Sequence, residues 1–257
     1  MPRIDYKPYM TYSRIWLEVT EGPFAVVAHA HRRAAAPANR RARHRAETRE
    51  RLFRAALQLF AERGFLETTI EDITEAADVG KGTFFNYFPT KEHVLATFGD
   101  ERIAVIERAA AEVRQTKGHV LPVIKNLATY LAGLSAESPA LLRSIYAANA
   151  SCAPVRSEMQ KRIGAARRLM TEMFAIAQQR GEIRSELSAA ELARLTQLVF
   201  HGVTLAWALN PDSVLLETTE AVWNLIIPAL SIASAVESRR SSRKKTVRTC
   251  ADVPSIG

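Results

Sequence analysis

The chain has 257 residues, 47% hydrophobic and 24% charged, and its 35 Lys and Arg residues against 27 Asp and Glu give a formal net charge of +8. This composition is typical of a soluble globular protein with one large or two modest domains. It contains no uninterrupted run of about 20 apolar residues and no apolar signal-peptide core at its start, so we expect a cytoplasmic protein that does not span a membrane. Its two cysteines, Cys152 and Cys250, are far apart and lack His or Cys neighbours at ligand spacing, which argues against a disulfide framework, a zinc finger or another metal site. We expect no cofactor.

The positive charge is concentrated in two tracts. Residues 31–45 (HRRAAAPANRRARHR) and 239–248 (RRSSRKKTVR) each carry six cations and no acid, so the rest of the chain is net acidic. Polar basic tracts are usually solvated and unstructured. We therefore expect a flexible basic N-terminal arm over residues 1–44 and a disordered basic tail over residues 237–257. The arm either lays arginines along DNA phosphates or is an inert extension.

The predicted elements begin with three short helical segments. Apolar residues from Leu52 to Phe60 recur at helical spacing, and Gly64 ends the first helix. Thr68 and Glu71 have the spacing of a capping box, which predicts a second helix that reaches about Ala77. The segment 78–80 (DVG) is a turn signal, and a third helix must end before Pro89. Residues 45–98 are thus predicted to form a three-helix module that contains a helix-turn-helix.

The remainder of the chain carries helical patterns and almost no strand signals. A capping box at Ser188 and Glu191 starts a long, mainly apolar helix. The predicted body helices cover residues 91–116, 119–134, 141–150, 155–179, 188–209 and 218–236. About nine helices in all predict an all-α fold, with the front module followed by a larger helical domain over residues 99–236.

The third helix of the module has two faces. At 100° per residue, Phe84 and Phe88 stack on one side as core, while Lys81, Gly82, Phe85 and Asn86 fall on the adjoining stripe. Such a stripe can face the major groove of DNA. Residues 46–98 are net negative, which favours a structural helical hairpin instead, but residues 79–91 hold two lysines and no acid.

At these residues the sequence resembles the DNA-binding module of the TetR (tetracycline-repressor-like) family of bacterial regulators. The resemblance covers about residues 48–98 and lies in Thr69, Ile73, Ala77, Val79, Gly82, Thr83, Tyr87, Phe88, Lys91 and Glu92. It implies a one-component regulator, usually a repressor, that binds a palindromic double-stranded DNA operator as a homodimer. It also implies release of that operator when a small-molecule effector enters the C-terminal helical domain.

The resemblance further implies roles for individual residues. Thr69 would meet a phosphate, Lys81 and Gly82 would approach bases, and Phe85 would stand where the family often has a phosphate-binding Tyr. The DNA backbone would be held by Thr83, Tyr87 and Lys91. Asp78 and Gly80 also depart from the family pattern, but both suit their turn and N-cap positions.

The helical body is expected to provide the dimer interface and the effector pocket. The resemblance implies that the last two helices pair with their copies, and the candidate interface residues are Leu198, Leu205, Trp223, Ile226 and Leu230. The alternative is that these helices form only the core of one chain. Candidate pocket residues are Tyr130, Tyr146, Met170, Phe174, His201 and Trp207, each of which could instead be ordinary core.

Other functional classes have less support. The dinucleotide and phosphate loops, HExxH and EF-hand motifs are absent, so we do not expect an enzyme. The main alternative is a ligand-independent DNA-organising helical dimer. A helical interaction protein attached to anionic membranes through its basic tails is a weaker one.

Overall fold

The computed structural model describes residues 40–136, 138–211 and 214–231. The predicted basic tail and residues 1–39 of the predicted arm lie outside these ranges. The chain divides into two compact units, residues 1–51 and 52–257, and α3 (Arg40–Arg63) crosses the boundary between them.

The helix α3 corrects the predicted end of the arm. It begins at Arg40, five residues before the boundary expected at residue 45, so residues 40–44 are helical. Arginine and alanine favour helix even without an apolar stripe, and Arg43 lies 3.6 Å from Glu47 one turn later. Basic composition alone was therefore a poor guide to where the helix starts.

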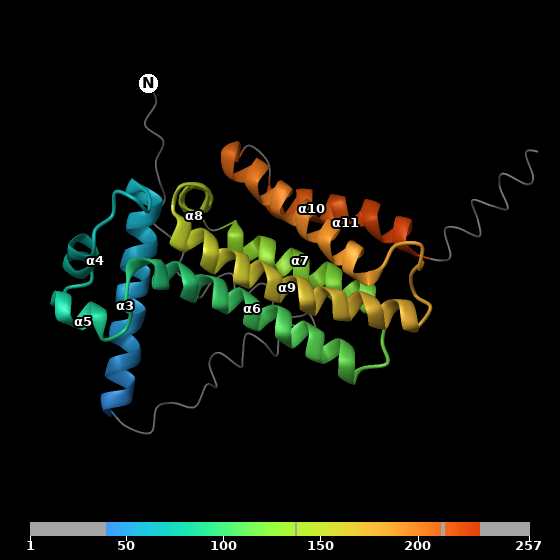
Figure 1. The fold of residues 1–257 in the computed structure, drawn as a ribbon, viewed down its shortest axis with the longest axis horizontal. Coiled ribbons are helices and arrows are strands. Elements are labelled where there is room, and N and C mark those ends of the chain that lie inside the picture. Colours follow the sequence, from blue (N-terminus) through green and yellow to red (C-terminus); the bar gives the residue numbers. More distant parts are fainter. Residues whose placement is uncertain (1–39, 137, 212–213, 232–257) are drawn as a thin grey trace, which may run out of the picture. The chain divides into compact units, whose positions relative to one another are not determined.

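Nine helices and no strand occur in the described ranges, which confirms the all-α class (Figure 1). An antiparallel bridge joins Ile183 and Ser231. After α3 the helices are α4 (Ile70–Ala76), α5 (Lys81–Phe85), α6 (Lys91–Gln115), α7 (Val120–Ser135), α8 (Pro139–Ser151), α9 (Ala153–Gln179), α10 (Ala189–Leu209) and α11 (Leu215–Leu230). Most boundaries lie within two residues of those predicted. The helix α11 starts three residues earlier than predicted, with Leu215 buried in the core, and it ends at Leu230 rather than at the predicted residue 236; residues 232–236 lie outside the described ranges.

The start of α4 differs in detail from the sequence prediction. The capping box is formed by Thr69 and Asp72, one residue after the predicted pair Thr68 and Glu71. Thr68 is fully buried, and its hydroxyl donates to the Gly64 carbonyl at 2.7 Å instead. The sequence contains the three-residue spacing of a capping box twice, as Thr68 with Glu71 and as Thr69 with Asp72. Because Thr68 is buried, the second pair forms the box.

The second unit contains a core that runs from the helix-turn-helix into the body. Phe60, Ile73, Phe84 and Phe88 are buried in one cluster, which also includes Ile145 of α8. The Phe65 backbone N–H donates to the buried Ser144 Oγ of α8 at 2.9 Å. The loop after α3 is therefore tied to the helical body by a hydrogen bond as well as by packing.

The rest of the body is a helical bundle. α9 packs against α6 and α10, and α11 packs against α7 (Figure 1). A second cluster fills its centre with residues such as Ile124, Met173 and Phe174. The predicted capping box of Ser188 and Glu191 is present at the start of α10.

The helix α10 is long and apolar enough, by length and composition, to cross a membrane. One of its faces packs on α8 and α9 within the bundle, and an apolar helix of a water-soluble bundle passes the same test. This feature alone therefore gives only weak evidence for a membrane segment.

Candidate functional site

The turn between α4 and α5 sets the position of α5. Asp78 adopts a left-handed conformation with φ of 51°, and its N–H donates to the Glu75 carbonyl. Aspartate tolerates this conformation better than most residues. Gly80 then caps α5 in an extended conformation. The predicted helix, three-residue turn and helix are confirmed.

The helix α5 is held by two aromatic side chains, Phe84 within it and Phe88, which the sequence analysis placed on the helix but which follows its end. Phe84 and Phe88 are buried, with ring centroids 5.6 Å apart, while Phe85 leaves 47% of its surface exposed. Lys81 and Gly82 are exposed as well, and a Cβ on Gly82 would meet no atom within 4 Å. The two-faced pattern expected for a groove-binding helix is present.

Lys81 forms an ion pair with Glu71 of α4, which the sequence analysis missed. The Lys81 hydrogen bond lowers the pKa of the Glu71 carboxyl. Both side chains are more than half exposed, so solvent screens the pair. A carboxylate next to Lys81 nevertheless means that any phosphate or base edge must compete with Glu71 for this ammonium group.

Thr69 has a structural role at the N-terminus of α4. Its Oγ1 accepts from the Asp72 N–H at 3.1 Å and donates to the Asp72 carboxylate at 2.7 Å. The hydroxyl donation to the carboxylate, and a second donation from the Thr69 backbone N–H at 2.8 Å, lower the pKa of Asp72, with a smaller contribution from Arg63. The predicted phosphate contact of Thr69 would have to be made from this engaged hydroxyl.

Lys91, predicted to hold the DNA backbone, is engaged by the protein itself. Its Nζ donates to the carbonyls of Phe65, Leu66 and Thr68 at 2.9, 3.2 and 2.9 Å and lies 4.7 Å from the centroid of the Phe65 ring. An ammonium group has three hydrogens, and all three are used. Lys91 thus ties the start of α6 to the loop between α3 and α4.

Thr83 and Tyr87, also predicted to hold the DNA backbone, are half-buried. Tyr87 packs on the cluster that contains Phe84 and Phe88, and the Thr83 N–H donates to the Gly80 carbonyl. The structure therefore brings five of the predicted DNA-binding residues together. Lys81, Gly82, Thr83 and Phe85 lie on α5, and Tyr87 lies two residues after its end.

Exposed apolar side chains line one side of α10, and α11 also exposes apolar side chains. Leu198 and Leu205 are exposed, as predicted for an interface, and Leu225 of α11 is 76% exposed. We define the exposed stripe by Leu195, Leu198, Val199, Leu205 and Leu209 of α10 and Leu225 of α11.

The structure places the other three predicted interface residues in or against the core of this chain. Trp223 and Leu230 are buried in the core of this chain, and Ile226 packs against the same core while partly buried. The sequence shows that α11 is apolar nearly all round but not which of its faces meets α7. Leu225, which directly precedes Ile226 in the sequence, is the exposed residue on this part of α11.

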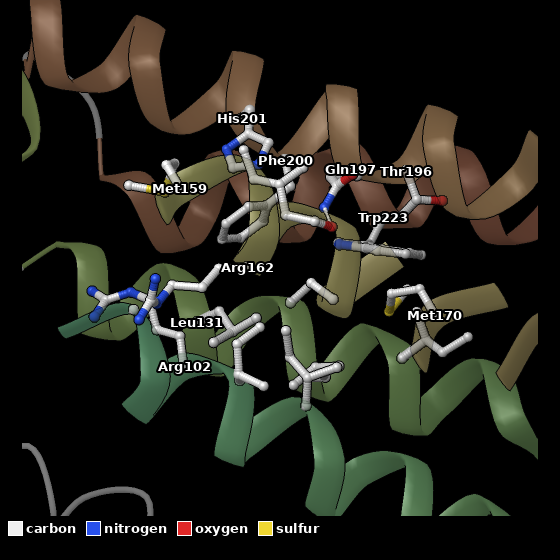
Figure 2. A pocket seen from close by; sticks show the side chains of 18 residues that line it. Arg102, Leu131, Met159, Arg162, Met170, Thr196, Gln197, Phe200, His201 and Trp223 are labelled. Carbon is white, nitrogen blue, oxygen red and sulfur yellow. Dashed lines mark hydrogen bonds between the residues drawn. The ribbon is translucent and has the colours of Figure 1, made fainter. Parts of the chain in front are cut away.

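A cavity of about 160 Å³, partly open to solvent, lies between α6, α7, α9, α10 and α11 (Figure 2). Of the predicted pocket residues, Met170 and His201 line it. The other four pack elsewhere: Phe174 and Tyr130 with the bundle core, Tyr146 and Trp207 in a smaller cluster near α8. These four do not line the cavity, because helical spacing does not distinguish core from cavity wall.

The cavity has a polar end that the sequence analysis missed. Arg102 of α6 and Arg162 of α9 lie together at one end, and Met170 and Trp223 lie toward the other (Figure 2). Arg162 donates to Asp100 and Glu158, both at about 3 Å. No sequence motif joins residues 60 positions apart on two helices, so only the tertiary structure reveals this end.

Comparisons with known proteins agree with this architecture. Residues 52–97 match the model of the bacterial regulatory proteins of the tetR family. The chain is 44% identical over 70 residues to the transcriptional regulator TcmR of Streptomyces glaucescens and 32% identical over 95 residues to the repressor DhaR of Mycobacterium sp. (strain GP1). These alignments cover 26% and 35% of this chain but only 29% and 44% of the two curated regulators.

A solved structure matches over a longer region. FadR of Thermus thermophilus, a TetR-family transcriptional repressor solved with lauroyl-CoA, is 34% identical, with a TM-score of 0.52. The match covers 70% of this chain and 93% of FadR. Together with the helix-turn-helix geometry, this similarity shows that the chain belongs to the TetR family of bacterial transcriptional regulators.

Proposed function

We propose that the protein is a cytoplasmic, DNA-binding transcriptional repressor that binds a palindromic operator as a homodimer and is released by a small-molecule effector. The observation that carries this proposal is the exposed face of α5, where Lys81, Gly82 and Phe85 lie beside a buried aromatic face. A short helix presented in this way suits the major groove.

Two further features support the proposal. The exposed stripe on α10 and α11 offers an apolar surface for a second copy, and a two-fold protein matches a palindromic operator. The cavity in the body favours a ligand-responsive regulator over the alternative of a ligand-independent DNA-organising dimer. FadR, the relative solved with lauroyl-CoA, supports an effector with an apolar part.

DNase footprinting of the full chain on the DNA flanking its own gene tests the proposal. We expect protection of one palindromic site that persists in excess random DNA. Uniform protection without a preferred site would support the DNA-organising alternative. Addition of a cellular metabolite extract should remove the footprint of a ligand-responsive repressor and leave that of a ligand-independent protein unchanged.

A further inference from the structure

The size of the cavity limits what it can hold. Its volume is about 160 Å³, and its walls are mainly aliphatic, including Ile103, Ile124 and Leu127. An apolar protein cavity of about 150 Å³ accommodates benzene. The cavity therefore fits a molecule of about one aromatic ring without any movement of the bundle.

The two arginines at the polar end, Arg102 and Arg162, donate hydrogen bonds to protein groups. Arg162 donates to Asp100 Oδ1 and Glu158 Oε2, so two carboxylates balance its charge and would repel an anion. Arg102 donates to the carbonyls of Phe98 and Leu134 at 3.3 Å, and its guanidinium lies 3.6 Å from the centroid of the Phe98 ring. A charged ligand would lose its hydration here without gaining a dedicated partner.

Gln197 on the cavity wall is also engaged. Its Oε1 accepts from Arg167 Nε at 2.9 Å, and its Nε2 donates to the Ile163 carbonyl at 3.0 Å. This amide holds α10 to α9, so a ligand could use it only by breaking that connection.

His201 of α10 is the wall residue best suited to recognise a polar group. Within the described ranges, its ring makes an edge-to-face contact with Phe200 at 6.1 Å but no hydrogen bond to a protein group. Burial lowers the pKa of His201, and Arg167 lowers it further, so the ring is neutral near pH 7. A neutral imidazole offers one donor and one acceptor.

We propose that this cavity binds an uncharged molecule of about one aromatic ring that carries a single hydroxyl or carbonyl group, and that His201 hydrogen-bonds this group. The inference rests on the effector role proposed above and specifies its ligand class. It differs from the acyl-CoA ligand of the FadR relative in size and in charge.

The test uses three probes that differ in one substituent. Titration calorimetry on the full chain without DNA compares 3-methylphenol with 1,3-dimethylbenzene, which has a methyl group in place of the hydroxyl, and with the anion 3-methylbenzoate. We expect 3-methylphenol to bind about tenfold more tightly than the hydrocarbon, as one buried hydrogen bond allows, and the benzoate to bind most weakly. Equal affinity for phenol and hydrocarbon, or tighter binding of the benzoate or of lauroyl-CoA, would overturn the proposal.

Variants of the cavity wall test whether the probes bind in the cavity and whether His201 contacts the hydroxyl group. His201→Leu should bring the affinities for phenol and hydrocarbon close together, and His201→Gln should restore part of the difference. Ala166→Leu, which adds volume to the wall, should weaken both probes, and unchanged affinities would mean that they bind elsewhere. Loss of discrimination in Thr196→Val but not in His201→Leu would overturn the assignment to His201. Circular dichroism checks that each variant is folded.

Operator binding is measured separately, on the chain without any probe. A chain that binds 3-methylphenol but no operator would contradict the proposed repressor function and leave the ligand class standing. A chain that binds its operator but binds 3-methylphenol no more tightly than the other two probes would contradict only the ligand class.

Discussion

At the scale of single residues, the ion pair of Lys81 and Glu71 places a negative charge on the proposed DNA-binding face. The acid lies on α4, one helix before the lysine that the sequence suggests for base contact. Electrostatic attraction to phosphate is independent of sequence, whereas contacts to base edges discriminate between sequences. The two partners should therefore affect DNA binding in different ways.

We expect Lys81→Ala to weaken operator binding by about 1 to 3 kcal/mol, with reduced discrimination at one base position in each half-site. Glu71→Gln should instead strengthen binding to operator and random DNA alike, because it removes a repulsive charge and frees Lys81. Fluorescence anisotropy at fixed salt measures both affinities. Glu186→Gln, the same charge change at an exposed site outside the module, is the matched control. Equal loss of operator and random DNA in Lys81→Ala would make Lys81 a phosphate contact.

His201 is a second residue whose environment has a measurable consequence. Burial lowers its pKa, so the unfolded chain binds more protons than the folded chain once the pH falls below about 6.5. Stability then rises with pH through this window and levels off above it. We expect urea denaturation of His201→Gln to show a smaller loss of stability between pH 7 and pH 5.5 than the parent chain shows. An identical pH dependence in both proteins would contradict this prediction.

At the scale of elements, the connection between α6 and the loop after α3 depends on one side chain. Lys91 satisfies three carbonyls that follow the end of α3, and its ammonium nitrogen lies 4.7 Å from the centroid of the Phe65 ring. Methionine keeps a similar length and apolar character but has no donor. Lys91→Met should therefore destabilise the DNA-free protein by about 1 to 3 kcal/mol, measured by chemical denaturation.

The control is Lys117→Met, in the exposed loop between α6 and α7, which should leave stability unchanged. If Lys91→Met keeps full stability and only lowers affinity for DNA, Lys91 acts as the phosphate contact that the family resemblance implies.

At the scale of the whole molecule, the exposed stripe on α10 and α11 is the surface that we assign to the dimer. Leu198→Glu combined with Leu225→Glu places two charges on exposed positions, so the chain should keep its helical content and become monomeric. Sedimentation velocity and circular dichroism measure these properties. Operator binding should weaken strongly, because a monomer contacts only one half-site.

Leu66→Glu provides the matched control, since Leu66 is also an exposed leucine, at 56%, but lies in the loop between α3 and α4. This variant should remain dimeric. A dimer that survives the double substitution would refute the assignment of the stripe, and unfolding would mean that both leucines support the core of a single chain.

The local pattern of the sequence determined the fold class, most helix boundaries and the two faces of α5. These features depend on residues that are only a few positions apart in the sequence. Examples are the spacing of Phe84 and Phe88, the turn at Asp78 and the cap at Ser188. The resemblance to the TetR family rests on the same short segment, which explains why the family was predictable and the effector was not.

Only the tertiary structure decided which apolar residues form core, cavity or exposed surface. Trp223 and Leu225 are two positions apart on one apolar helix, yet one is buried and the other is 76% exposed. Likewise, Lys81 and Lys91 are both cations in the proposed DNA-binding segment, but one contacts a carboxylate and the other three carbonyls. The physical reason is that burial and polar partners come from elements distant in the chain, such as α7 beside α11 and the loop after α3 beside α6, and no periodicity encodes those distances.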